Sequence, residues 1–162
     1  MNSVQQRIEA LIGEFADLDS REKLELLVDF ANGLPPLGPD YTARKEIEDR
    51  RVHECQTPVF LWTEVEDGRA RLVGEVAPEA PTVKGFVAIL AEAVNGRPVA
   101  DVAAIPDDML ERMGLADVLG ILRSRGLRAI VARVQRGFAA QAAGGRGPAD
   151  RDSRTQPAAG SP

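Results

Sequence analysis

The strongest constraint on the fold is the Asp67-Gly68 dipeptide, which separates two runs of strand-forming residues, VFLWTEVE and RARLVGEV. Asp-Gly favours the tight two-residue turn that joins antiparallel strands. In the second run charged residues alternate with apolar or small ones, as in a strand with one face in solvent. We therefore predict a β-hairpin, and residues 50–53 are expected to add a short third strand before it.

Apolar residues at helical spacing lie on both sides of this hairpin. The predicted helices cover residues 4–16, 20–32, 82–94, 99–103 and 106–113, with a longer one from about residue 123. The LPPLGPD segment before the hairpin is expected to be an extended connector, because adjacent prolines disfavour helix. Helices, a small antiparallel sheet and then more helices indicate an α+β domain.

The 162 residues are expected to form one domain over residues 1–142 and a disordered tail over residues 143–162. The tail has few bulky apolar residues and many Gly and Pro, so burial cannot offset the entropy lost on ordering it. The N-terminus lacks the pattern of a secretory signal, and no stretch approaches the roughly 20 apolar residues of a membrane span. We therefore expect a soluble cytoplasmic protein. The net charge of −5 argues against nucleic acid or an anionic membrane as its main partner.

Cys55 is the only cysteine, and it lies two residues after the only histidine, His53. This chain therefore has too few thiol and imidazole ligands for a zinc site or an iron–sulfur cluster, and we predict no metal site. Free cysteines are often buried as small apolar residues. The polar neighbours of Cys55, and a proline at position 58 that disfavours helix before it, instead indicate a loop. This setting favours an exposed or semi-exposed thiol.

Two kinds of thiol chemistry fit a single cysteine. In a hydrolase His53 would act as the base for Cys55, but the sequence shows no clear third group to orient the imidazole. In sulfur transfer, the thiolate attacks the outer sulfur of another protein's persulfide, which requires neither a base nor a second cysteine. A resolving cysteine would expel the sulfur and form a disulfide, so a lone thiol suits a sulfur carrier.

Four short segments, in the same order along the chain, resemble segments of the SufE family of sulfur-acceptor proteins. They are LPPL at 34–37, RVHECQTPVFL at 51–61, TVKGFVAIL at 82–90 and RSRGL at 123–127. The second resembles the family segment that carries the acceptor cysteine, and the last resembles the start of its final helix. The resemblance extends over about residues 8–140.

The resemblance implies an α+β fold of the SufE/IscU type, with two N-terminal helices, a three-stranded antiparallel sheet and C-terminal helices. It implies that Cys55 accepts sulfur from a SufS-type cysteine desulfurase and activates that enzyme. Pyridoxal phosphate would belong to the desulfurase, so this chain would hold no cofactor. Its other partners would be downstream iron–sulfur scaffold proteins, with no role for nucleic acid or membrane. The chain would be a transpersulfuration partner rather than a stand-alone enzyme. The alternative is an adaptor that binds and regulates an enzyme without carrying sulfur.

Three residues of the cysteine loop receive roles from the resemblance. Cys55 would form the persulfide, and Gln56 would be its neighbour in the loop. Glu54 stands where the family often has glycine. Its negative charge beside the thiol is expected to raise the pKa of the cysteine.

Three residues outside the loop also match family motifs. Lys84 and Gly85 belong to the VKG motif, and Arg123 matches an arginine near the desulfurase contact. Each has a structural alternative. Gly85 would allow close backbone packing at a helix start, Lys84 would be a solvated surface charge, and Arg123 would form an ion pair with an acidic neighbour such as Asp117.

Overall fold

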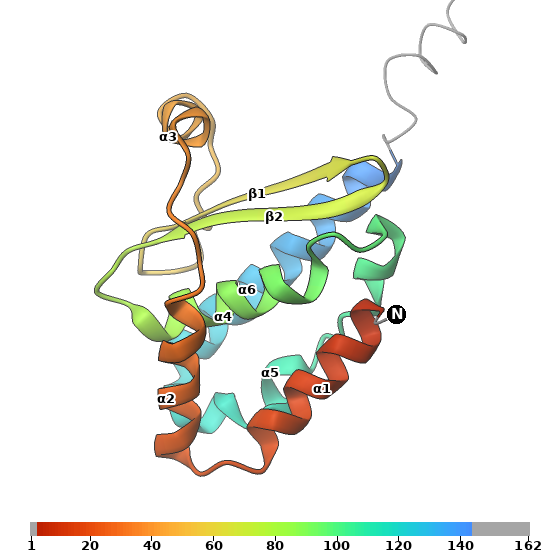
Figure 1. Cartoon of the computed structure of the whole chain (residues 1–162). Coiled ribbons are helices and arrows are strands. Elements are labelled where there is room, and N and C mark those ends of the chain that lie inside the picture. Colours follow the sequence, from red (N-terminus) through yellow and green to blue (C-terminus); the bar gives the residue numbers. More distant parts are fainter. Residues whose placement is uncertain (1–2, 144–162) are drawn as a thin grey trace, which may run out of the picture.

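The computed structural model of the chain describes residues 3–143. Ala143, the first residue of the predicted tail, is the last residue of a helix, and the rest of the predicted tail lies outside the described residues. The elements are α1 (Val4–Ala16), α2 (Ser20–Ala31), α3 (Pro39–Lys45), β1 (Val59–Glu66), β2 (Arg69–Val76), α4 (Pro81–Val94), the 3-10 helix η1 (Val99–Ala104), α5 (Met109–Arg112) and α6 (Leu115–Ala143). In Figure 1 the hairpin lies across α4 and α6, with α1 and α2 on the far side of these helices. This arrangement confirms the predicted α+β class.

The two N-terminal helices begin as their sequences predict. Asp19 caps α2: its side chain accepts a hydrogen bond from the backbone N–H of Glu22, whose own side chain accepts from the N–H of Asp19. Ser3 and Gln6 form the same reciprocal pair at the start of α1. These caps pair backbone groups that a helix end leaves unsatisfied. The caps fix the first residue of each helix, and this determines which residues of the helix face the core.

In the described part of the chain the sheet has two strands, rather than the predicted three. Residues 50–52 run beside β1 and exchange backbone hydrogen bonds with it, but only Arg51 forms a bridge, opposite Phe60. The chain then turns inward, because the backbone N–H of Cys55 donates to the carbonyl of Val52 over 3.1 Å. Because the chain turns here, the extended segment is too short to form a third strand.

Helix α3 was not expected, since its first two residues lie in the segment predicted to be extended. Proline suits the first position of a helix, where its fixed φ is already helical and its missing N–H is not needed. Pro39 takes this position, with Gly38 as the N-cap, so the extended connector ends before it. Tyr41 of α3 packs edge-on against Trp62 of β1, with ring centroids 5.4 Å apart.

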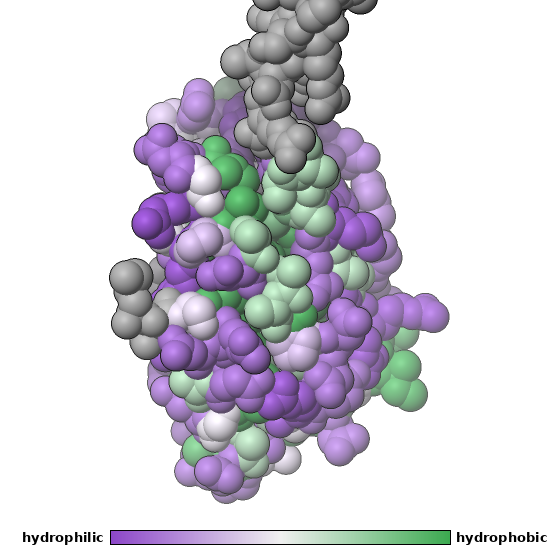
Figure 2. All heavy atoms as spheres, turned by 90° about the vertical axis from the view of Figure 1, so that its right-hand side faces the viewer, coloured by the Kyte–Doolittle hydropathy of each residue, from purple (hydrophilic) through white to green (hydrophobic). Residues whose placement is uncertain are grey.

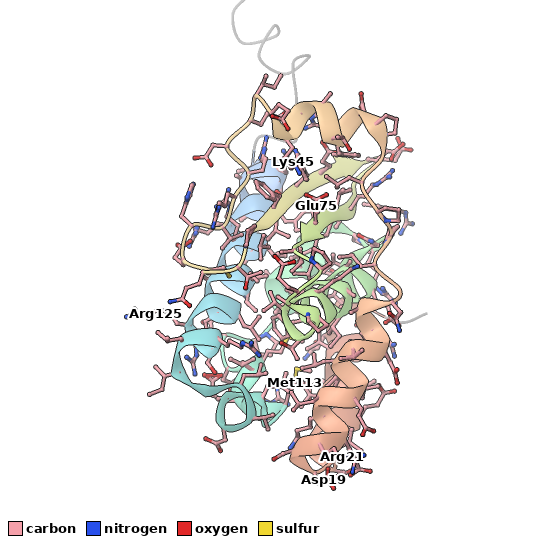
Figure 3. All side chains as sticks on the ribbon, turned by 90° about the vertical axis from the view of Figure 1, so that its left-hand side faces the viewer. Asp19, Arg21, Lys45, Glu75, Met113 and Arg125 are labelled. Carbon is pink, nitrogen blue, oxygen red and sulfur yellow. The ribbon has the colours of Figure 1, made fainter. Side chains whose placement is uncertain are left out.

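Helix α3 covers part of the outer face of the hairpin. On β2, Arg69 and Arg71 are exposed, as the prediction of a solvated face requires, whereas Glu75 is partly covered. Lys45 and Glu75 form an ion pair of 2.7 Å between α3 and β2, and Figure 3 shows the two side chains close together there. Arg44 binds Glu64 of β1 at 3.0 Å. The inner face carries residues such as Leu61 and packs on α4 and α6.

Helix α6 is interrupted at Gly120, whose φ of 84° is accessible to glycine and strained for other residues. Regular helix therefore resumes at residue 121, two residues before the predicted start. Residues 99–104 and 109–112 form the two short helices that the sequence predicts. Between residues 3 and 143, no helix combines the length and apolar content needed to cross a membrane.

Candidate functional site

Cys55 lies in the turn between Arg51 and β1, and its side chain is buried, with 6% of its surface exposed. The expectation of an exposed or semi-exposed thiol is therefore wrong. The turn directs Val52 and Cys55 inward, while His53, Glu54 and Gln56 remain exposed. Sγ of Cys55 donates a hydrogen bond to the carbonyl oxygen of Gly126 in α6 over 3.4 Å.

One face of α6 holds the whole segment that carries the thiol. Residues seven apart lie two turns apart on the same side of a helix, so Gly126 and Arg133 face the same way. Gly126 meets Cys55, and Nη1 of Arg133 donates to the backbone carbonyl of Arg51 over 3.1 Å. One turn further on, a side chain at Gly137 would overlap Thr63 of β1. The cysteine turn is thus held in place by contacts with α6 at Gly126 and Arg133.

Neither Gly126 nor Gly137 was expected to take part in the site. A glycine inside a helix costs about 1 kcal/mol relative to alanine. Its presence in a strong helical pattern is one signal of close approach by another chain segment, although Gly13 of α1 has nothing within 4 Å. This signal is visible in the sequence, but it does not say which segment approaches.

Cys55 opens onto a small cavity of about 140 Å³ between its turn, α4 and α6. The cavity is lined by Cys55, Gln56, Thr57, Val83, Leu122, Arg123, Gly126 and Leu127. Three residues singled out in the sequence, Cys55, Gln56 and Arg123, therefore meet at one pocket. Glu54 is exposed beside the thiol, outside the lining.

Arg123 is exposed in the first turn of the regular helix that follows Gly120. Its Nη1 donates to Oγ1 of Thr82 at the start of α4, over 3.4 Å. Within residues 3–143 Arg123 forms no ion pair, so the structural alternative of a pair with Asp117 is wrong. The guanidinium stays at the rim of the cavity, available to an anionic group.

The other two motif residues lie beside the pocket rather than in it. Lys84 is partly exposed on α4, directly after Val83 of the lining. Gly85 is buried, and a Cβ on it would overlap the backbone carbonyl of Leu27 in α2. Gly85 therefore allows the backbones of α2 and α4 to pack against each other. This is the structural role expected from the sequence as the alternative to a role in the site.

His53 does not interact with the thiol. It is exposed, and its Nε2 lies 2.9 Å from Oδ1 of Asp49. The hydrogen bond of Cys55 goes instead to Gly126. A cysteine–histidine hydrolase has no support in this geometry. Among the described residues, no three Cys, His, Asp or Glu side chains are grouped closely enough to bind a metal ion.

The electrostatic setting keeps the thiol protonated. The pKa of Cys55 is raised to about 11, chiefly by burial and to a lesser extent by the negative charge of Glu54, while Arg51 acts in the opposite direction. The expected influence of Glu54 is therefore present, but desolvation is the larger cause. With this pKa, about one Cys55 in a thousand is a thiolate at pH 8. A protonated thiol is also what the hydrogen bond to Gly126 requires.

A larger groove of about 490 Å³ lies elsewhere, between η1 and the C-terminal part of α6. Its lining consists of Val99, Ala100, Val102, Ala103, Gln135, Arg136, Ala139 and Ala142. Figure 2 looks onto this end of the molecule and shows green residues in a band among purple ones. The groove has no nucleophile, so the smaller cavity at Cys55 remains the candidate site.

The chain is similar to known proteins along most of its length. Residues 9–138 match the SufE family, described as an Fe-S metabolism associated domain. An uncharacterized SufE-like protein of Mycobacterium tuberculosis is 41% identical over 127 residues, which cover 78% of this chain and 87% of the relative. The sulfur acceptor protein CsdE of Escherichia coli is 30% identical over 125 residues, covering 75% and 81%. The solution structure of a hypothetical protein from Thermus thermophilus superposes with a TM-score of 0.71 at 33% identity, covering 86% of this chain and 96% of that one. The chain therefore belongs to the SufE family.

Proposed function

We propose that this protein accepts sulfur onto Cys55 from a pyridoxal-phosphate cysteine desulfurase of the SufS type and activates that enzyme, for iron–sulfur cluster assembly. The observation that carries the proposal is the position of the chain's only cysteine, in a pocket with Arg123 at its rim. The similarity to CsdE, which is named a sulfur acceptor, supports it. Sulfur would pass from Cys55 to an iron–sulfur scaffold protein.

The transfer is an exchange between two cysteines. The thiolate of Cys55 attacks the outer sulfur of the persulfide on the desulfurase. The sulfur–sulfur bond of the donor breaks, its cysteine leaves as a thiolate, and a new sulfur–sulfur bond forms on Cys55. The proton of the Cys55 thiol is lost before the attack. No oxidant or reductant is consumed, because one persulfide replaces another.

This step requires Cys55 to leave its resting position. The thiolate is the reactive form, and the buried thiol is almost entirely protonated. Within its pocket Sγ is held by one hydrogen bond to Gly126. Moving the turn outward would return the thiol to water, lower its pKa and extend it toward a partner's active site. Docking of the desulfurase is the event that would stabilise this open state.

The surface beside the pocket suits a protein partner. Ile121 and Leu122 are 86% and 64% exposed, although both are large aliphatic residues. Arg123 follows them, and Arg125 points outward from α6 in Figure 3. Exposed aliphatic residues flanked by arginines are typical of protein interfaces. An acidic, partly apolar face of the desulfurase would complement this surface.

Intact-protein mass spectrometry tests the proposal. The full chain is incubated with a SufS-type desulfurase and free cysteine, then measured with and without a thiol reductant. The expected result is a gain of one sulfur atom, which the reductant removes and which Cys55→Ser lacks. The matched control omits cysteine from the mixture. A chain that activates the desulfurase without gaining sulfur would contradict the carrier function.

A second candidate is an adaptor that activates the desulfurase without carrying sulfur. The buried, protonated state of Cys55 favours it, because a residue with only a packing role would look the same. The same variant separates the two. Cys55→Ser retains full activation of the desulfurase if the chain is an adaptor, and loses it if sulfur must pass through the thiol.

A further inference from the structure

A second polar pocket, of about 350 Å³, lies where α6 crosses β1. Its lining consists of Arg50, Leu61, Thr63, Arg133, Arg136 and Gly137. Three of these six residues are arginines, and none is acidic. The pocket shares no lining residue with the cavity at Cys55, so it is a separate site.

The fold brings these arginines together from two parts of the chain. Arg50 comes from the segment that runs beside β1, while Arg133 and Arg136 come from α6. The missing side chain at Gly137 lets α6 approach Thr63, and both residues line the pocket. The arginines therefore converge because of backbone geometry, in a chain whose net charge is −5.

The positive charge in this pocket is only partly balanced. Arg50 pairs with Glu48 at 2.8 Å. Arg133 donates to the backbone carbonyl of Arg51, which carries no charge. Arg136 is exposed and has no hydrogen-bond or ion-pair partner among the residues that the structure describes. Two of the three guanidinium groups thus lack a carboxylate.

The nearest acidic residues already have other partners. Glu48 binds Arg44 as well as Arg50, and accepts a hydrogen bond from the indole N–H of Trp62. Asp49 pairs with His53 at the surface. Asp49 also attracts Arg133 through its charge, without forming an ion pair with it, whereas Arg136 has no ion-pair or hydrogen-bond partner among the described residues.

We propose that this arginine pocket binds an oxyanion, either a phosphate group or a carboxylate. Guanidinium groups are planar forks of N–H donors that match the paired oxygens of both anions. The hydroxyl of Thr63, which makes no hydrogen bond within residues 3–143, offers a further donor. The volume exceeds what a bare phosphate ion needs, so a phosphate ester or an acidic side chain of another protein also fits.

Titration of the full chain with inorganic phosphate, at constant ionic strength set by chloride, tests this proposal. Two-dimensional NMR follows the backbone amides of α6 and the Nε–H groups of the arginines. Saturable shifts centred on Arg133 and Arg136, with millimolar affinity, are expected. Arg136→Gln should weaken the affinity roughly tenfold or more, because a charge-assisted pair is lost. Its melting temperature without phosphate should be unchanged, since the side chain is exposed.

Arg21→Gln is the matched control, because it removes the same charge from an exposed arginine. Arg21 lies on α2, and Figure 3 shows it at the opposite end of the molecule from Lys45 and Glu75. This variant should bind phosphate as the wild type does. Equal weakening by both variants would mean a response to net charge and would overturn the proposal, as would shifts that never saturate.

A second titration, with a short polyglutamate peptide, distinguishes the sources of the oxyanion. Saturable binding of phosphate alone indicates a phosphate ligand, and binding of the peptide alone indicates an acidic segment of a protein. If Arg136→Gln loses the response to both probes, phosphate and the peptide bind in the same pocket, which supports the proposal. Binding of neither probe overturns the proposal. The sulfur-transfer experiment at Cys55 is independent of every one of these outcomes.

Discussion

The thiol of Cys55 is packed directly against the backbone of Gly126. Sγ lies 3.4 Å from the carbonyl oxygen of Gly126, and a Cβ at position 126 would lie only 2.9 Å from that sulfur. The absence of a side chain on one helix residue thus provides the space for the thiol. The burial of the sulfur, and with it the reactivity of the thiol, therefore depends on α6 as much as on the cysteine turn.

Gly126→Ala should make Cys55 more reactive in the free protein. The new methyl group displaces Sγ, while Cα and Cβ of Cys55 remain at ordinary distances of 3.6 and 3.7 Å. We expect native-state labelling by a disulfide reagent to accelerate about tenfold, because opening of the turn costs less free energy. Gly13→Ala in α1, where nothing lies within 4 Å, is the matched control and should leave the rate unchanged. Equal rates for the wild type and Gly126→Ala would show that Gly126 does not restrict access.

The pH dependence of alkylation should differ between the folded and unfolded chains. The rate follows the thiolate fraction, so for the native protein it should keep rising until about pH 11, whereas the urea-unfolded chain should level off near the ordinary pKa of 9.0. Because burial raises the pKa in the folded state, the stabilisation is complete below pH 9 and is lost as the pH rises through 11. The free energy of unfolding should therefore fall more steeply with pH in this range for the wild type than for Cys55→Ser. Parallel curves would contradict the raised pKa.

Arg123→Ala should retain a near-native melting temperature and lose most activation of the desulfurase. The side chain is exposed and makes one long hydrogen bond to Thr82, so its loss should change stability by less than about 1 kcal/mol. A contact that is desolvated in the complex can cost about 2–5 kcal/mol of binding when truncated. Arg21→Ala removes an exposed charge from α2, away from this surface, and serves as the control. Full activation by a stable Arg123→Ala, or early unfolding of that variant, would refute a docking role.

Gly85→Ala should destabilise the fold without involving the site. A methyl group here would overlap the main chain of Leu27, which cannot move aside as a side-chain end could. We expect a loss of about 1–3 kcal/mol or more in the free energy of unfolding, measured by urea denaturation. The same substitution at Gly13 should instead stabilise the chain by about 0.5–1 kcal/mol, because alanine favours an open helix position. A neutral effect at position 85 would mean that α2 and α4 can separate at little cost.

Local patterns were sufficient to predict most of the fold. The apolar spacing of α1, α2 and α4 and the Asp67-Gly68 turn are properties of neighbouring residues, and each predicts its element independently. Helix α3 was missed because its stability comes from distant partners. Tyr41 and Lys45 hold it on the hairpin through Trp62 and Glu75. A seven-residue helix without such contacts would have little stability of its own.

The site was predicted only in part, for the same reason. The resemblance to the SufE family identified three residues of the pocket, Cys55, Gln56 and Arg123, because each lies in a short motif. The burial of the thiol depends on Gly126, which is 71 residues further along the chain. No pattern near Cys55 carries that information, so polar neighbours suggested exposure where the structure shows burial.

The same separation has a consequence for synthesis of the chain. At about 5–20 residues per second, a ribosome adds the 71 residues between Cys55 and Gly126 in about 4–14 s. Until α6 has been made and has docked, the sulfur lacks the helix that later covers it, and its pKa is that of an ordinary unfolded cysteine. The nascent chain is thus more open to oxidation and alkylation than the finished protein. Protection of the thiol begins only when the last helix has been made and has docked.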